Sequence, residues 1–180
     1  NFRAAQGKRI DWLDTGVENN FSNFLFIDQR YDSDPVMRRI FSLARKLNYK
    51  SLLIEKIDEA DCNLLAEENA ALQLRRSDFL SSEVHRISFF RNSVDSSQFD
   101  FCGYVVFKRD RFSGTPVLAT HVYESVMKPP RQEHENNFIH CKQTYSVNTT
   151  LGQFSISGVL YAQQNDLTFV CAHVGLRSVL

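Results

Sequence analysis

The feature that most constrains the fold of this chain is an unbroken apolar run, FCGYVVF, at residues 101–107. A strand with one face in water alternates apolar and polar residues, whereas a run without polar positions needs cover on both faces. We therefore expect a central strand here, with other elements packed on each side of its sheet. No apolar run in the sequence approaches the length of a membrane span.

Further segments with strand character lie on both sides of this run in the sequence. Residues 116–127 alternate in polarity, and the pattern predicts one face made of Leu118, Thr120, Val122 and Val126. Residues 154–161 alternate strictly, and their predicted apolar face consists of Phe154, Ile156, Gly158 and Leu160. The other predicted strands cover residues 23–29, 51–57, 84–90 and 138–147.

Two segments predict helices that flank the sheet. Asp34 is placed to cap the first helix, Pro35 suits its first helical position, and Asn48 is expected to end it. Its predicted packing face consists of Val36, Ile40, Leu43 and Leu47. Residues 60–76, rich in Ala, Leu and Glu, predict a second helix with a less regular apolar face. The predicted fold class is therefore α+β, with a mixed or antiparallel sheet and flanking helices.

The size and charge of the chain limit its organisation and its partners. Its 180 residues suit one domain, or the N-terminal part of a larger one. Basic and acidic residues are equal in number, at 21 each, so no overall charge favours nucleic acid or an acidic membrane as the partner. The basic clusters at residues 38–39, 75–76 and 108–111 are interleaved with acids, and we interpret them as solvated faces.

The cysteine pattern indicates a reduced, cytoplasmic protein. The four cysteines are scattered, without the spacing of a disulfide framework or a zinc site, at Cys62, Cys102, Cys141 and Cys171. The N-terminal segment is polar and lacks the apolar stretch of a signal peptide. We expect no metal and no cofactor, and we interpret the first three cysteines as structural.

Cys171 differs because it begins a short and nearly apolar segment. Residues 171–180 predict a buried helix that places Cys171 in its first turn. The backbone dipole and unpaired N–H groups at a helix N-terminus favour the thiolate, which is the nucleophilic form. Two amide side chains upstream, Gln163 and Gln164, are candidate donors for an oxyanion hole.

This region also resembles a known enzyme family. The sequence GVLYAQQNDLTFVCAHVGLRSV, residues 158–179, resembles the nucleophile region of papain-like cysteine peptidases, in particular a bacterial branch related to peptidases that process bacteriocin leaders. The block GYVVFKRDRFSGTPVLAT extends the resemblance, which covers residues 101–180; residues 1–100 form an unassigned α/β region. The resemblance implies a papain-like nucleophile helix at the C-terminal end, with Cys171 as nucleophile, Gln164 as oxyanion-hole donor and Gln163 in reserve.

The sequence departs from this family in two ways. Asn165 stands where the family has an acidic residue, and Asp166 follows one place later. The family's general-base His lies after the cysteine helix, whereas this chain ends at Leu180. The resemblance therefore implies a base outside this chain. We expect the 180-residue chain alone to be inactive, and a further segment or a partner subunit to cover the cysteine helix.

The leading functional hypothesis is thus a cysteine peptidase that attacks peptide or isopeptide bonds of a peptide or protein substrate. One alternative is a non-catalytic binding module on the same scaffold, in which Cys171 is structural. A second alternative is a transglutaminase-like acyl transferase. We rank a coenzyme-A-type acyltransferase last because no glycine-rich phosphate loop is present. His85, His121 and His140 lie on predicted strands and are the reserve candidates for a general base.

Overall fold

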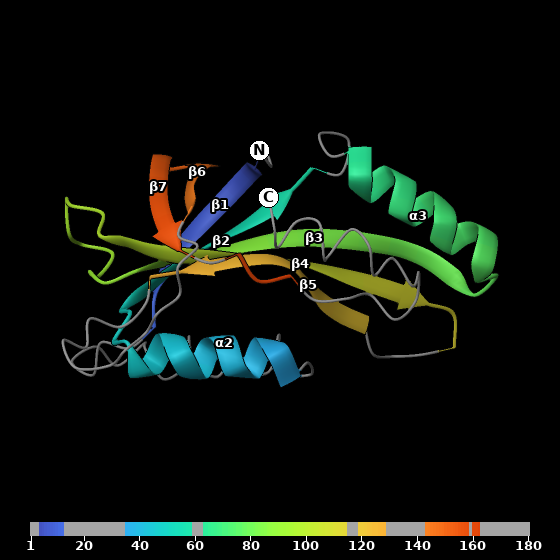
Figure 1. Cartoon of the computed structure of the whole chain (residues 1–180), viewed down its shortest axis with the longest axis horizontal. Coiled ribbons are helices and arrows are strands. Elements are labelled where there is room, and N and C mark those ends of the chain that lie inside the picture. The colour runs from blue at the N-terminus through green and yellow to red at the C-terminus, as the bar shows by residue number, and fades with distance from the viewer. Residues whose placement is uncertain are drawn as a thin grey trace.

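The computed structural model describes residues 4–12, 35–58, 63–114, 119–128, 143–158 and 160–162. A five-stranded sheet dominates this part of the chain, and its strands lie side by side in sequence order, each antiparallel to its neighbours (Figure 1). The strands are β1 (Ala4–Asp11), β2 (Ser51–Ile57), β3 (Phe79–Phe90), β4 (Phe101–Phe112) and β5 (Ala119–Met127).

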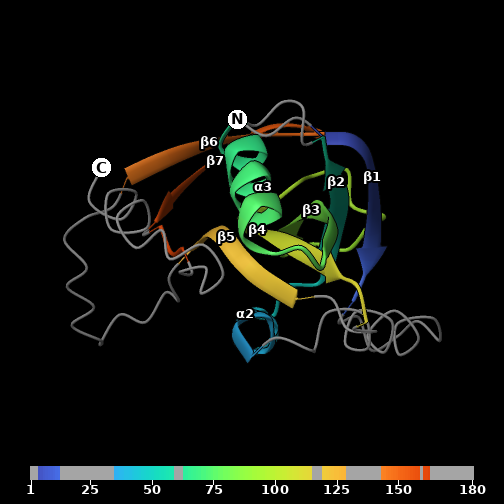
Figure 2. The ribbon, with the colours of Figure 1, turned by 90° about the vertical axis from the view of Figure 1, so that its right-hand side faces the viewer.

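The remaining elements cover the two faces of this sheet. Helix α2 (Pro35–Lys46) packs on one face. Helix α3 (Asn63–Arg75) and a hairpin of β6 (Gln143–Thr149) and β7 (Gly152–Gly158) lie on the other face, at opposite ends of it (Figures 1 and 2). Neither helix has the length and apolar content that a membrane crossing would require, within the described residues.

Strand β4 is interior to the sheet, as the apolar run predicted. On the α2 side it contributes Cys102, Val105 and Phe107 to one core cluster. On the hairpin side it contributes Phe101, Tyr104 and Val106 to a second core cluster. Both faces of the strand are therefore buried, because α2 covers one cluster and the hairpin covers the other.

Helix α2 forms where the sequence predicted, but its packing face is different. Its buried residues are Met37, Ile40, Phe41 and Ala44. Leu43, which was predicted to pack, is 39% exposed, while Val36 and Leu47 are only partly buried. The Phe41 ring lies edge-on to Trp12 at 5.5 Å, so this large side chain turns the packed face away from Leu43. The helix ends at Lys46, and Asn48 adopts the left-handed conformation, with φ of 56°.

Strand β5 contains an irregularity that alternation alone did not reveal. Val106 pairs with Glu124, and the next residue, Phe107, pairs with Val122, so one extra residue is inserted in β5. Val122 therefore packs on the α2 side and Val126 on the hairpin side. The prediction that both valines share one face is wrong.

The hairpin is attached to the sheet by apolar packing and by a buried ion pair. Phe154, Ile156 and Leu160 pack in the hairpin-side core, as their alternation predicted. Arg86 Nε lies 2.8 Å from Glu55 Oε2, and both side chains are almost fully buried. Arg86 also donates to the Asn148 carbonyl at 2.6 Å, and Thr150 N donates to Glu55 Oε1 at 2.7 Å. The pair therefore fastens the hairpin turn to the sheet.

The predicted fold class is wrong. The described residues are mostly antiparallel strand, and the region that resembles a papain-like nucleophile half contributes β4, β5 and the β6–β7 hairpin. The chain's last regular element within the described residues is a strand, because the alternating residues of β7 find an apolar surface on the sheet. The predicted nucleophile helix at residues 171–180 and the predicted strand at residues 23–29 lie outside the described residues. Strand β1, at the sheet edge, was not predicted, since its sequence has little apolar content.

Candidate functional site

The site predicted from the sequence lies outside the described residues. This holds for Cys171 and for both amide donors, Gln163 and Gln164. Their roles as nucleophile and oxyanion-hole donors therefore stay predictions. Three features of the described part of the chain remain as candidates: the surroundings of Cys102, a buried group of charged side chains under α3, and the outer face of α2.

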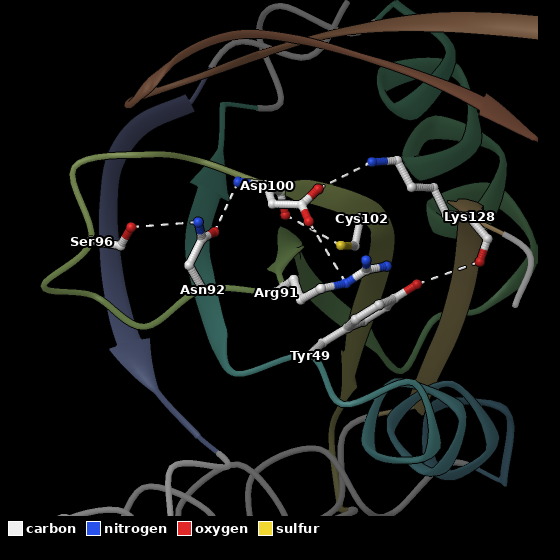
Figure 3. Close-up of polar contacts among 7 residues, drawn as sticks. All are labelled: Tyr49, Arg91, Asn92, Ser96, Asp100, Cys102 and Lys128. Carbon is white, nitrogen blue, oxygen red and sulfur yellow. Dashed lines mark hydrogen bonds and ion pairs between the residues drawn. The ribbon is translucent and has the colours of Figure 1, made fainter. Parts of the chain in front are cut away.

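Cys102 lies near the start of β4, among polar groups from four elements or loops (Figure 3). Its thiol donates to the Asp100 carbonyl at 3.2 Å. The Asp100 carboxylate faces two cations, with Lys128 Nζ at 3.3 Å and Arg91 Nε at 3.7 Å. The Tyr49 hydroxyl donates to the Lys128 carbonyl at 3.4 Å. These contacts join the end of β5 to the loop between β3 and β4.

The electrostatics of this group oppose thiolate formation. Burial is the main cause that raises the pKa of the Cys102 thiol, and the Asp100 carboxylate raises it further, against the smaller opposite effects of Lys128 and Arg91. Burial likewise raises the pKa of the Tyr49 hydroxyl. Both side chains are therefore held in their neutral forms, and Cys102 is a core residue rather than a nucleophile.

The loop between β3 and β4 is closed by its own polar side chains. The Asn92 amide accepts from Asp100 N at 2.8 Å and donates to Ser96 Oγ at 3.4 Å (Figure 3). Asp11 on β1 accepts from Val94 N at 2.8 Å. The polar residues around Cys102 thus have structural partners that account for their positions.

A second candidate is a buried ionic cluster, which we define as Glu68 on α3, Lys108 and Asp110 on β4, and His121 on β5. Lys108 Nζ lies 3.5 Å from Glu68 Oε2 and 3.3 Å from Asp110 Oδ1. His121 lies between the same two carboxylates, at 3.7 Å from Glu68 and 3.9 Å from Asp110. The side chains of Lys108 and Asp110 have no exposed area. The sequence-based interpretation of residues 108–111 as a solvated face is therefore wrong for these two residues.

The ionic cluster fastens α3 to the sheet. Lys108 supplies a positive charge between the two carboxylates, and Ser82 Oγ adds a hydrogen bond to Asn69 Oδ1 of α3 at 2.9 Å. Within the described residues, no group of three or more His, Cys, Asp or Glu side chains could hold a metal ion. Sequence reasoning could have found Lys108 and Asp110, because continuing the alternation of β4 places both on the face of the buried Val106.

The described imidazoles lie away from the described thiol. His85 stacks on Phe107, with ring centroids 5.7 Å apart. Phe107 is about 16 Å along β4 from Cys102, at roughly 3.3 Å per residue. His121 lies in the ionic cluster, beside Asp110 further along the same strand. The structure therefore brings neither His85 nor His121 to Cys102 as a general base.

The third candidate is the outer face of α2. The helix has the sequence PVMRRIFSLARK and contains no acidic residue. At about 100° per residue, its exposed cations and one serine fall within an arc about 120° wide. We call this arc the basic face of α2; it consists of Arg38, Arg39, Ser42, Arg45 and Lys46. The predicted interleaving with acids is not found inside the helix.

Comparison of the chain with protein-family models, with curated proteins and with solved structures finds no match.

Proposed function

We propose that the described part of this chain is a protein-binding domain that contacts its partner through the basic face of α2. The observation that carries this proposal is the segregation of charge on α2. All its cations point to solvent from one arc, while the opposite arc is buried in the core. Apolar burial of that arc attaches α2 to the sheet, and exposed charges generally contribute little to stability. A face with only positive charges suits recognition of a negatively charged partner.

The thiol of the described domain is not suited to nucleophilic catalysis. Cys102 is free and buried, and its raised pKa keeps it protonated at neutral pH. A reduced thiol in the core also fits a cytoplasmic location, which is part of the proposal. The domain would then act by presenting a rigid surface, with α2 held on the sheet by its apolar residues.

Site-specific photocrosslinking in a cell extract tests this function without assuming the chemistry of the partner. A photoreactive amino acid replaces Ser42, in the middle of the basic face, and in a control it replaces the exposed Ser97 in the loop between β3 and β4. We expect a discrete protein adduct from position 42 and none from position 97. Equal labelling at the two positions, or no adduct at position 42, would contradict the proposal.

A cysteine hydrolase is the second candidate, and the sequence around Cys171 favours it. Gln163, Gln164 and Cys171-Ala172 match the pattern that the papain-like resemblance implies. In such an enzyme the thiolate attacks a peptide carbonyl, a thioester forms, and a His supplied from outside this chain protonates the leaving amine. A transglutaminase-like transferase would use the same thioester but an amine acceptor.

Thiol labelling separates this second candidate from a purely binding role. Cys102 provides an internal standard, because burial and a raised pKa should make it slow to react. If Cys171 is an activated nucleophile, iodoacetamide near neutral pH should label it fastest of the four cysteines, as read by mass spectrometry of tryptic peptides. A Cys171 rate no greater than that of Cys102 would remove the case for thiol catalysis.

A further inference from the structure

We propose that the basic face of α2 binds an acidic peptide segment that also carries an apolar side chain. This inference rests on the proposed binding function and specifies the chemistry of the partner. Its basis is the identity, spacing and surroundings of the exposed α2 residues.

The cations on this face are suited to carboxylates. Three of the four are arginines, whose planar guanidinium can bind a carboxylate through two parallel hydrogen bonds. Between residues that the structure describes, no ion pair involves Arg39 or Lys46. These two side chains are exposed, so they offer positive charge to a partner without breaking an ion pair of the described fold.

The spacing of the cations matches an extended peptide. Arg38 and Arg45 are separated by seven residues, as are Arg39 and Lys46, which places each pair about 10.5 Å apart along the helix axis. An extended chain advances about 3.3 Å per residue. Acidic residues three positions apart in a peptide would therefore reach both members of a pair. The two pairs run parallel along the helix, so one peptide can lie along the face.

Leu43 distinguishes a peptide from a polyphosphate. It is 39% exposed and lies next to the basic face, about 40° from Arg39 around the helix. An apolar side chain of a peptide can cover Leu43 and remove its surface from water. The phosphate groups of a nucleic acid offer only charged and polar atoms. Contact with them would leave Leu43 without an apolar partner.

The charge of the rest of the chain also favours a short partner. Removing the four α2 cations from the total leaves 21 − 4 = 17 basic residues against 21 acidic ones, so the remaining chain has a formal charge of −4. A long polyanion such as DNA, or a broad anionic membrane, would meet this negative remainder as well as α2. A short peptide bound along α2 would not. Membrane insertion is further opposed because the apolar arc of α2 is buried against the sheet.

Fluorescence anisotropy with a labelled peptide tests this inference. The probe is a short peptide with Glu at every third position and Leu between, and a peptide with Lys in place of Glu is its charge-reversed control. Arg39→Glu with Lys46→Glu is compared with Lys56→Glu with Arg111→Glu. The second pair is exposed on the sheet and changes the net charge by the same amount. Arg39→Gln with Lys46→Gln removes the charges without reversing them, and circular dichroism checks that every variant is folded.

We expect the acidic probe to bind the wild-type chain and the lysine probe not to bind. The α2 double Glu variant should weaken binding by at least ~10-fold, the Gln variant by less, and the control variant by less than about twofold. Equal effects of the α2 and control variants would overturn the inference. Duplex DNA or phosphatidylserine vesicles that bind more tightly than the peptide, with the same dependence on Arg39 and Lys46, would also overturn it.

The two proposals fail in different ways. A crosslinked partner at position 42 together with no peptide binding would leave the binding function standing and remove the acidic-peptide chemistry. No crosslink and no peptide binding would remove both.

Discussion

The two helices of this protein attach to the same sheet by different means. Helix α2 buries an apolar arc, which includes Met37 and Phe41, and turns its cations to solvent. Helix α3 buries Leu72 completely, but it also turns Glu68 and Asn69 toward Lys108 and Ser82 of the sheet, while Leu74 is 88% exposed. The attachment of α2 is thus apolar, whereas that of α3 combines an apolar contact with charged and polar ones.

This difference determines how well each attachment could be foreseen from the sequence. The apolar residues of α2 recur at helical spacing within one segment, so the sequence of this segment predicts that the helix packs against the sheet. Glu68 of α3 faces a lysine on β4 and a histidine on β5, both far away in the sequence. A charged residue in a helix gives no sign that a distant strand will bury its counter-ion. The α3 region should therefore depend on charge pairing, and the α2 region on packing.

The largest effect is expected from Lys108→Met. It removes the ammonium group that lies 3.5 Å from Glu68 and 3.3 Å from Asp110 in a buried site, and removal of one partner from a buried ion pair costs about 3–5 kcal/mol. The free energy of unfolding, measured by urea denaturation and the fluorescence of Trp12, should fall by that amount. Adding Glu68→Gln and Asp110→Asn to the same variant should restore part of it. A loss below about 1 kcal/mol would mean that α3 is not held by charge pairing.

A somewhat smaller loss is expected on the α2 side from Met37→Ala. Met37 is fully buried between α2 and the sheet, and truncation of a buried methionine costs about 2–5 kcal/mol through lost burial and a residual cavity. Adding Glu68→Gln and Asp110→Asn should not restore any of this loss, because no charge is involved at Met37, whereas the same two substitutions should restore part of the Lys108→Met loss. The measurement is urea denaturation of both variants with and without the added pair. Equal recovery in the two variants would contradict the contrast between the helices.

An intermediate effect is expected from alkaline pH, which should lower the free energy of unfolding through two residues of the α2-side core. Burial raises the pKa of Tyr49 and of Cys102, so the folded state favours their neutral forms. The corresponding stability is complete below their unfolded-state pKa values, near 9 to 10, and is lost as pH rises toward the folded-state values. Urea denaturation at pH 8 and about pH 10.5 should therefore show a smaller alkaline loss for Tyr49→Phe with Cys102→Ala than for the wild-type chain. Tyr161→Phe, at an exposed position, serves as the control and should not reduce the loss.

The smallest effect is expected from Leu74→Ser on α3. Because Leu74 is 88% exposed, its replacement removes almost no buried apolar surface, and the free energy of unfolding should change by less than about 0.5 kcal/mol. The same urea measurement checks this value. A loss above about 2 kcal/mol would show that Leu74 packs in solution and that the two helices attach in the same way.

Much of the fold could be predicted, but its arrangement could not. The apolar run of β4 predicted an interior strand covered on both faces, and the alternation of β7 predicted the packed face of the hairpin. The extra residue in β5 escaped prediction because a bulge depends on how two strands pair, not on the polarity of one strand. The resemblance around Cys171 led to a wrong fold class, because a local pattern of residues carries no information about how the preceding strands pair.

The candidate sites were also predicted only in part from the sequence. The cations of α2 were visible in the sequence as the Arg38-Arg39 pair, but only the helix shows them gathered with Arg45 and Lys46 on one exposed arc. Cys102 was interpreted as structural, and its burial and raised pKa agree with that interpretation. The ionic cluster was missed, since its four members come from three elements.

By itself, the sequence determined the local elements of this protein: where α2 begins and ends, that β4 is interior, and which face of β7 is apolar. These properties depend on neighbours within a few residues, where helical and strand periodicity act directly. Only the tertiary structure decided which side of α2 packs, that Val122 and Val126 lie on opposite faces of the sheet, and that Lys108 is buried beside Glu68. Those outcomes depend on contacts between residues far apart in the chain, whose energies no single segment contains.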